Sequence, residues 1–266
     1  MKILSVNAGS SSLKFNVIEL PERKELINGY FQKVGLSDSF YYVKINGEKI
    51  THEVPLKNHL DCVECLKEEL FKNNIIESLE EIDGVGHRLV HGGDRFKSSV
   101  LITDEVLELC ETFNDLAPLH NPPMLECVKA FQDAMPNTPM VAVFDTSFHQ
   151  SMEATEYIYP VPYEWYTKYG VRKYGFHGTS HKYINKTISE IMDRDDLKVI
   201  SCHIGSGASI CAINAGKVVD TTMGFSPLAG LMMGTRCGDI DPSIITYIMQ
   251  KENKTVEEVF NDLNKN

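Results

Sequence analysis

The sequence has little basic charge, a single tryptophan and no long apolar run. Lysine and arginine number 26 against 37 aspartates and glutamates, which gives a formal net charge of −11. A nucleic-acid-binding or membrane-surface protein needs a basic face, so neither class of partner is expected. No stretch approaches the roughly 20 apolar residues that span a membrane, and the N-terminus lacks the pattern of a secretory signal. We therefore expect a cytoplasmic protein that binds neither nucleic acid nor membranes.

Paired cysteine motifs are also scarce. The seven cysteines are an odd number spread along a chain that is too large to need disulfides for stability, which fits a reducing compartment. Cys62 and Cys65 form one C-x-x-C motif, and it lies in a segment with the pattern of an amphipathic helix. Because no second pair completes a zinc site, buried packing is the favoured interpretation of these two thiols.

The apolar patterning predicts an α/β protein. The 266 residues, 42% of them hydrophobic, are enough for one large domain or two ordinary ones. Strands dominate the first third, where Asn46-Gly47 between two alternating segments indicates a hairpin. A short buried strand at 140–144 ends on Asp145. Helical patterns cover residues 59–73, 103–116 and 122–135.

One local pattern occurs twice. Residues 3–17 and 199–213 both read as a strand, a small polar turn and a second strand, and they align Asn7 with His203. The Gly9-Ser10 and Gly205-Ser206 pairs then coincide, and such turns expose successive backbone N–H groups that bind anions. One such turn is ordinary, but two indicate a duplicated fold that holds a polyphosphate. The expected domains are 1–150 and 151–266, and the Pro- and Tyr-rich stretch 154–170 is expected to connect them.

Seven unusual strings carry a family resemblance. They are VNAGSSSLKF, GHRLVHGGDRF, PLHNPP, FDTSFH, YGFHGTSH, HIGSGAS and MGTRCGDIDP. In this order and spacing the sequence resembles the acetokinase family. The resemblance implies two ribonuclease H-like (actin-like) α/β domains with a cleft between them, the second one incomplete here. It also implies phosphoryl transfer between ATP and acetate, giving ADP and acetyl phosphate. The implied cofactor is Mg²⁺, with Mn²⁺ as a substitute, and the implied complete enzyme is a homodimer.

The resemblance also implies a role for each matching residue. The implied catalytic residues are Asp145, His177 and Arg236. The implied acetate site has Arg88 for the carboxylate and, for the methyl group, Val90, Leu119, Phe176 and Pro227. The implied ATP-binding residues are Lys14, His203, Ile204, Gly205, Ser206 and Gly207, and Asn7 is implied near the metal.

The chemistry of the acceptor modifies one of these roles. A carboxylic acid with a pKa of roughly 4 to 4.5 is already ionised at neutral pH, so it needs no general base. We therefore expect Asp145 to orient an arginine or the metal instead of abstracting a proton. Simple structural roles are expected for several other polar residues. These are His91, His149 and His181, held by local hydrogen bonds, and Asp239 and Asp241, capping the helix that follows.

The sequence departs from the family pattern at three places. Ser206 stands where many relatives have asparagine, and Cys237 where serine is common; both are small, so modest effects are expected. The resemblance also implies a Gly-rich adenosine loop, a glutamate near the metal and a terminal helix beyond residue 266. The chain is therefore expected to be a C-terminally truncated member that has little activity and no dimer by itself.

Three alternative functions stay open. The first is a propionate or butyrate kinase, which differs only in the volume of the apolar pocket. The second is a catalytically silent fragment. The third is a non-enzymatic nucleotide-dependent module, which is disfavoured because Arg88, His177 and Arg236 supply a second anion site that such a module does not need.

Overall fold

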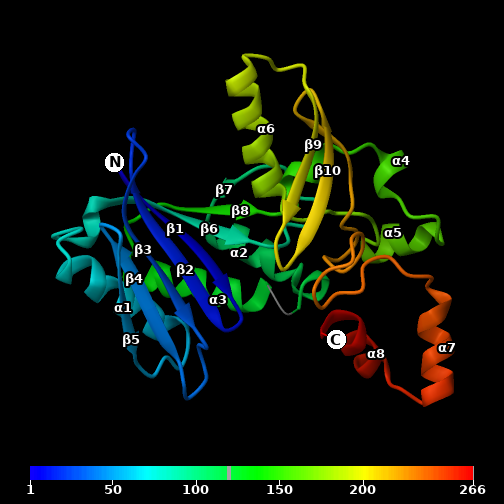
Figure 1. The fold of residues 1–266 in the computed structure, drawn as a ribbon, viewed down its shortest axis with the longest axis horizontal. Coiled ribbons are helices and arrows are strands. Elements are labelled where there is room, and N and C mark those ends of the chain that lie inside the picture. The colour runs from blue at the N-terminus through cyan, green and yellow to red at the C-terminus, as the bar shows by residue number, and fades with distance from the viewer. Residues whose placement is uncertain (119–120, 266) are drawn as a thin grey trace. The chain divides into compact units, whose positions relative to one another are not determined.

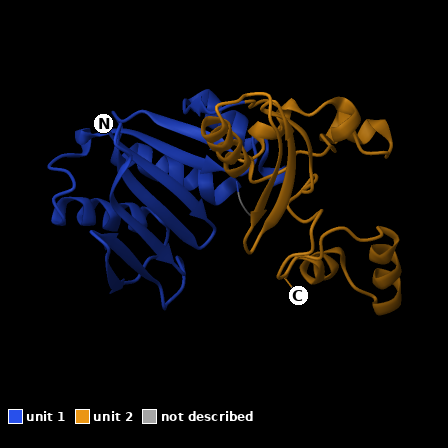
Figure 2. Cartoon of the chain, turned by 45° about the horizontal axis from the view of Figure 1, so that its top comes forward, with its two compact units in different colours: residues 1–92, 98–144 blue, residues 93–97, 145–266 orange. Residues whose placement is uncertain are grey.

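The computed structural model describes residues 1–118 and 121–265, which form two compact units (Figure 2). Unit 1 comprises Met1–Gly92 and Ser98–Phe144, and unit 2 comprises Gly93–Lys97 and Asp145–Asn266. Each unit has its own sheet, and both sheets contain an antiparallel meander of three strands (Figure 1).

Unit 1 is built on a sheet of eight strands in the order β5-β4-β3-β2-β1-β6-β8-β7. The strands are β1 (Lys2–Gly9), β2 (Ser12–Glu19), β3 (Lys24–Gln32), β4 (Phe40–Ile45), β5 (Glu48–Glu53), β6 (Ile82–Leu89), β7 (Val100–Leu101) and β8 (Met140–Phe144). Strands β1 to β5 pair antiparallel, whereas β6 is parallel to both β1 and β8. The core order β3-β2-β1-β6-β8 is that of a ribonuclease H-like domain, which confirms the predicted fold class for this unit.

The α-helices described in unit 1 are α1 (His59–Lys72), α2 (Asp104–Glu111) and α3 (Asn121–Ala134), and η1 (Leu79–Glu81) and η2 (Asn114–Leu116) are 3₁₀ helices. Helix α3 packs on β1, β6 and α1, and its fully buried Phe131 forms part of the core. Helix α1 begins where the Asn58 side chain accepts a hydrogen bond from the backbone N–H of Asp61. Cys62 lies fully buried in α1, and burial raises the pKa of its thiol to about 12, so the packing interpretation of this cysteine is confirmed.

Unit 2 has a sheet of three strands in the order β11-β10-β9. They are β9 (Lys198–Ile204), β10 (Ala208–Asn214) and β11 (Lys217–Thr221). The helices described in this unit are α4 (Ala154–Tyr157), α5 (Tyr163–Tyr169), α6 (Gly178–Met192), α7 (Ser243–Glu252) and α8 (Val256–Lys265), with a 3₁₀ helix, η3 (Ser147–Ser151). Helix α6 packs against β9 and η3. Within the described residues no helix is long and apolar enough to cross a membrane.

The stretch 154–170, predicted to connect two domains, instead folds into the helices α4 and α5 of unit 2. Helix α5 begins after Pro162 and ends at Gly170, whose φ of 65° supplies the left-handed turn that commonly ends a helix. The guanidinium of Arg172 then lies 3.6 Å from the centre of the Tyr157 ring. Tyr157 therefore packs against Arg172 within unit 2, whereas Tyr163 and Tyr169 are exposed.

Candidate active site

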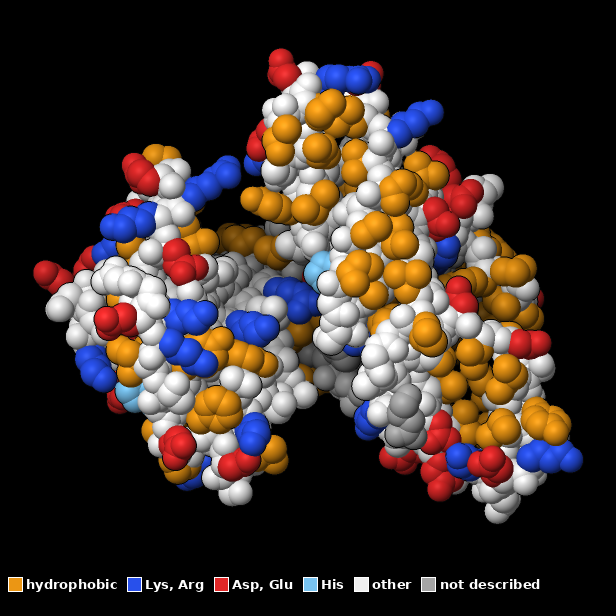
Figure 3. Space-filling view, in the orientation of Figure 1, with side chains coloured by type: hydrophobic (Ala, Val, Ile, Leu, Met, Phe, Trp, Pro, Cys, Tyr) orange, Lys and Arg blue, Asp and Glu red, His pale blue; other side chains and the backbone are white. Residues whose placement is uncertain are grey.

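The first hairpin that we expect to bind phosphate is formed by β1 and β2 in unit 1. Its two-residue turn lies between Gly9 and Ser12, which are paired, and Asn7 lies opposite Lys14. The Lys14 ammonium lies 4.7 Å from the centre of the Tyr30 ring, so a cation–π contact holds this side chain over the sheet. Lysine and arginine side chains gather over these strands in the space-filling view (Figure 3).

Arg88 lies one residue before the end of β6, beside the carboxyl end of β1. Its Nη1 donates a hydrogen bond of 3.0 Å to Oδ1 of Asn7. The residue expected to bind the carboxylate and the residue expected near the metal are therefore joined. Val90, two residues after Arg88, is 5% exposed.

Asp145 follows β8 and begins the main segment of unit 2. Its buried backbone carbonyl accepts a 2.9 Å hydrogen bond from the N–H of Gly178, the first residue of α6. A Cβ on Gly178 would lie 2.2 Å from that carbonyl oxygen, so only glycine fits there. Oδ1 of Asp145 lies 3.5 Å from the Thr179 hydroxyl, which places the carboxylate at the first turn of α6, where a helix favours negative charge.

His177 is fixed by its backbone and by its ring. Its φ of 60° and ψ of 20° are left-handed, which is uncommon for a residue other than glycine. The ring stacks on His203 with 4.0 Å between ring centres, and its Nδ1 lies 2.8 Å from Oγ of Ser209. Such backbone outliers cluster at functional sites, because the surrounding structure must hold them in place.

The second hairpin that we expect to bind phosphate joins β9 to β10 through residues 205–207, where the N–H of Gly205 donates to the carbonyl of Gly207 at 3.1 Å. A Cβ on Gly207 would lie 3.3 Å from Nε2 of His177 and 3.4 Å from Nη1 of Arg236. Two nitrogen donors and the hairpin therefore converge on one point of unit 2. Burial lowers the pKa of Arg236, because its guanidinium is poorly hydrated there, and this favours a bound anion.

The loop that carries Arg236 is closed by hydrogen bonds to Asp239. The Asp239 carboxylate accepts from the N–H of Gly230 at 2.8 Å, and the Asp239 N–H donates to the Gly230 carbonyl at 2.9 Å. The expectation that Asp239 caps the next helix is therefore wrong. Asp241 does accept from the N–H of Ser243 at the start of α7, at 2.9 Å, as predicted.

A family model described as the acetokinase family matches residues 2–266 of this sequence. The chain belongs to the acetokinase family. It is 53% identical over 266 residues to the acetate kinase of Geobacillus sp. (strain WCH70). The alignment covers 99% of this chain and 67% of that relative.

Two solved structures of acetokinases are also similar. The Porphyromonas gingivalis acetate kinase matches with a TM-score of 0.94 and 45% identity, covering 99% of this chain and 67% of its own. A propionate kinase from Francisella tularensis matches with a TM-score of 0.95 and 42% identity, covering 99% and 68%. The fold of this acetokinase chain is therefore that of the carboxylate kinases.

The residues expected to enclose the methyl group are placed in part. Phe176 is 2% exposed, directly before His177. Pro227 is half-buried, and its carbonyl accepts a 3.0 Å hydrogen bond from Nη1 of Arg236. Leu119 lies outside the described residues, as does His120.

Sequence reasoning missed the serines around the histidines of this acetokinase. Ser209 lies directly opposite His203 in the β9–β10 register, and Ser201 lies on the same face of β9, two residues from His203. His181, expected to be structural, is fully buried and lies within hydrogen-bond distance of both serines. The sequence does predict the β9–β10 hairpin, and pairing its two strands in register would have placed Ser209 opposite His203.

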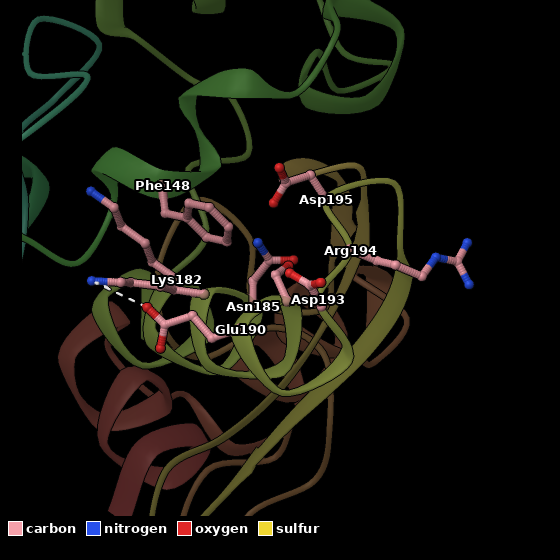
Figure 4. Close-up of a pocket in the computed structure, with 10 residues that line it drawn as sticks. Phe148, Lys182, Asn185, Glu190, Asp193, Arg194 and Asp195 are labelled. Atoms are coloured by element: carbon pink, nitrogen blue, oxygen red, sulfur yellow. Dashed lines mark ion pairs between the residues drawn. The ribbon is translucent and has the colours of Figure 1, made fainter.

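A pocket of about 640 Å³ lies along α6 and is also lined by Phe148 of η3 and by Gly216 in the β10–β11 turn (Figure 4). Its wall carries both charge signs, including Lys186 and Glu190 in an ion pair of 3.7 Å. None of the described residues that the family resemblance implies at the active site lines it. The pocket is therefore separate from the candidate active site.

Proposed function

We propose that this chain supplies the acetate- and phosphoryl-binding residues of an acetate kinase, which transfers a phosphoryl group reversibly between ATP and acetate to give ADP and acetyl phosphate. The observation that carries the proposal is the convergence of His177 Nε2 and Arg236 Nη1 beside Gly207. Phosphoryl transfer needs positioning and charge neutralisation, and two donors aimed at one point beside a phosphate-binding hairpin supply both.

Arg88 is the proposed carboxylate ligand. A guanidinium has five N–H donors in a planar fork, so one can hold Asn7 while two others bind a carboxylate side by side. Acetate is ionised at neutral pH, and no base has to remove a proton from it. The buried Asp145 at the start of α6 then serves to orient its surroundings, including Thr179.

His177 and Arg236 are the proposed ligands of the transferring phosphoryl group in the transition state. Charge spreads over its three equatorial oxygens in the transition state, where prearranged donors in a poorly hydrated site act most strongly. Lys14 and the hairpin 203–207 are the proposed ligands of the ATP phosphates, since backbone N–H groups and an ammonium both bind polyphosphate.

Mg²⁺ is the proposed metal, and Mn²⁺ offers the same oxygen-seeking chemistry. When bound, the ion neutralises charge on the phosphates. Magnesium keeps several waters and usually needs only one or two protein oxygens beside the phosphates. Oδ1 of Asn7 fits that need, because an amide oxygen has a second lone pair beside the one that accepts from Arg88. Across residues 1–118 and 121–265 no group of three or more His, Cys, Asp or Glu side chains forms a metal site.

Propionate is the second candidate substrate, and the similarity to the Francisella propionate kinase favours keeping it. One additional methylene changes binding in an apolar pocket by only about 1–3 kcal/mol. Comparing kcat/KM for acetate, propionate and butyrate decides between them. We also propose a cytoplasmic location, supported by seven free thiols, and a homodimeric complete enzyme.

The test measures acetyl phosphate, trapped with hydroxylamine, from ATP, Mg²⁺ and acetate. Two proteins are compared: the 266-residue chain and the same chain fused after residue 266 to the C-terminal third of the Geobacillus relative. We expect acetyl phosphate from the fused protein and its loss on Arg236→Ala. A fused protein that is folded and binds ATP but forms no acyl phosphate overturns the proposal.

A further inference from the structure

A chain of hydrogen-bonding groups runs from His177 into the interior of unit 2. His177 Nδ1 lies 2.8 Å from Oγ of Ser209, and the same Oγ lies 2.8 Å from Nε2 of His181. On its far side, His181 Nδ1 lies 2.9 Å from Oγ of Ser201. Ser209 and His181 have no exposed surface and Ser201 is 3% exposed, so water does not compete for these bonds.

The chain has only two possible directions. A serine hydroxyl carries one proton, so Ser209 donates to one of its two imidazoles and accepts from the other. Burial, with a smaller contribution from His203, lowers the pKa of His181 to about 4, so its ring is neutral at pH 7. A neutral imidazole has one N–H and one acceptor nitrogen. Fixing the proton on any one of these groups therefore fixes it on all of them.

The position of His177 Nε2 selects the direction. This nitrogen faces Gly207 and Arg236, where the phosphoryl oxygens of the proposed reaction bind, and it must carry a proton to donate to them. We propose that Ser209, supported by His181 and Ser201, is a positioning group that holds His177 in its Nε2–H tautomer. Ser201 donates to His181 Nδ1, His181 Nε2–H donates to Ser209, and the Ser209 hydroxyl donates to His177 Nδ1.

The opposite direction belongs to the neutral Nδ1–H tautomer of His177 and to its protonated ring. A cationic ring carries a proton on Nδ1 as well, so Ser209 would have to accept from it and every bond behind would reverse. The other ionisable groups around this ring are His203, His181, His149 and Arg236. The proposed direction is the one that leaves Nε2–H of His177 as the donor and Nδ1 as the acceptor.

The test reads the tautomer directly and does not need activity. Long-range ¹H–¹⁵N correlation of the ¹⁵N-histidine-labelled 266-residue chain at pH 7.5 reports which ring nitrogen of His177 is protonated. We expect Nε2–H in the wild type and in Ser209→Thr, and a mixture of tautomers in Ser209→Ala. Ser180→Ala is the matched control: it removes a 2.9 Å partner of His203 Nδ1 but lies outside the chain of bonds, so His177 should keep its tautomer.

Ser201→Ala provides a second variant should Ser209→Ala fail to fold, and we expect it to shift the His177 tautomer in the same direction but less. A wild-type ring protonated mainly on Nδ1, or a tautomer ratio unaffected by removing either chain serine, overturns the inference. In the fused protein, Ser209→Ala should lower kcat roughly tenfold while KM for ATP and acetate stays within about twofold. The inference rests on the proposed function, but the two can fail separately. If the serine variants shift the His177 tautomer and the fused protein has no kinase activity, the proposed function is refuted and the role of Ser209 is not.

Discussion

Gly207→Ala should slow phosphoryl transfer without weakening the hairpin. The new methyl would lie 3.3 Å from His177 Nε2 and 3.4 Å from Arg236 Nη1, whereas relaxed contacts between heavy atoms lie at about 3.5–4.0 Å. Both donors must therefore retreat by a few tenths of an ångström. Gly207 has no left-handed φ, so the backbone itself accepts alanine.

The magnitude follows from the displacement. A misplacement of about 1 Å costs on the order of 10²-fold in rate, so a few tenths of an ångström at each of two donors should cost roughly tenfold in kcat. KM for acetate should change little, because the side chains nearest to the new methyl are those of His177 and Arg236, and neither is the proposed carboxylate ligand. The hydroxylamine assay on the fused protein measures both quantities.

Gly205→Ala is the matched control in the same turn. Its Cβ would meet only the Gly207 carbonyl oxygen, at an ordinary 3.5 Å, and neither His177 nor Arg236, so it should change KM for ATP through the hairpin and lower kcat less than Gly207→Ala does. Thermal unfolding of both variants checks that neither has lost its fold. Equal losses of kcat in the two variants would refute the convergence of His177 and Arg236 beside Gly207 as the cause.

Three further predictions address other parts of the chain. Arg88→Ala should remove roughly 2–5 kcal/mol of acetate binding, seen as a raised KM that added guanidine partly restores; a normal KM contradicts the assignment. Asp145→Asn should raise the Mg²⁺ requirement and keep the acid limb of the pH–kcat profile, whereas loss of that limb would make Asp145 a general base. Burial holds the pKa of His87 at about 3, below the unfolded value of 6.5, so the folded state binds fewer protons and its stability falls as pH drops below 6.5. Between pH 7 and 5 this one residue should account for about 2 kcal/mol, so His87→Leu should lose that much less stability over this range in urea titrations than the wild type does.

Much of the fold was predictable because its signals are local. The β1–β2 and β9–β10 hairpins combine alternating apolar residues with a turn of small residues, so both strands and turn appear within 15 residues of sequence. Asp145 ends a buried strand that a continuous apolar run marks clearly. Gly178 looks like an ordinary turn residue in the sequence. Glycine is required there because the Asp145 carbonyl, 33 positions earlier in the sequence, leaves no room for a Cβ.

The parts that could not be predicted depend on distant residues. Asp239 precedes a helix and was therefore predicted to cap it. Its carboxylate instead accepts a hydrogen bond from the backbone N–H of Gly230 and so closes a loop. Residues 154–170 were predicted to be a linker, because a stretch rich in Pro and Tyr is typical of irregular structure. The contact of Arg172 with the Tyr157 ring, which packs this stretch into unit 2, is visible only in the structure. The serine–histidine chain draws residues from α6, β9 and β10, and only the strand register reveals it.

The hydrogen bond between Asn7 and Arg88 has a consequence for how metal binding and acetate binding influence each other. It places one donor–acceptor pair in common between the residue proposed for the metal and the residue proposed for the carboxylate. A bound carboxylate that reorients the Arg88 guanidinium would weaken its hydrogen bond to Asn7 and so alter the position of the amide oxygen that is proposed to bind the metal. A metal bound to that oxygen would in turn alter the orientation of the guanidinium. Thermodynamic linkage makes this effect equal in both directions. Binding of the metal is thus expected to change the affinity for acetate, and binding of acetate the affinity for the metal, through a single bond 3.0 Å long.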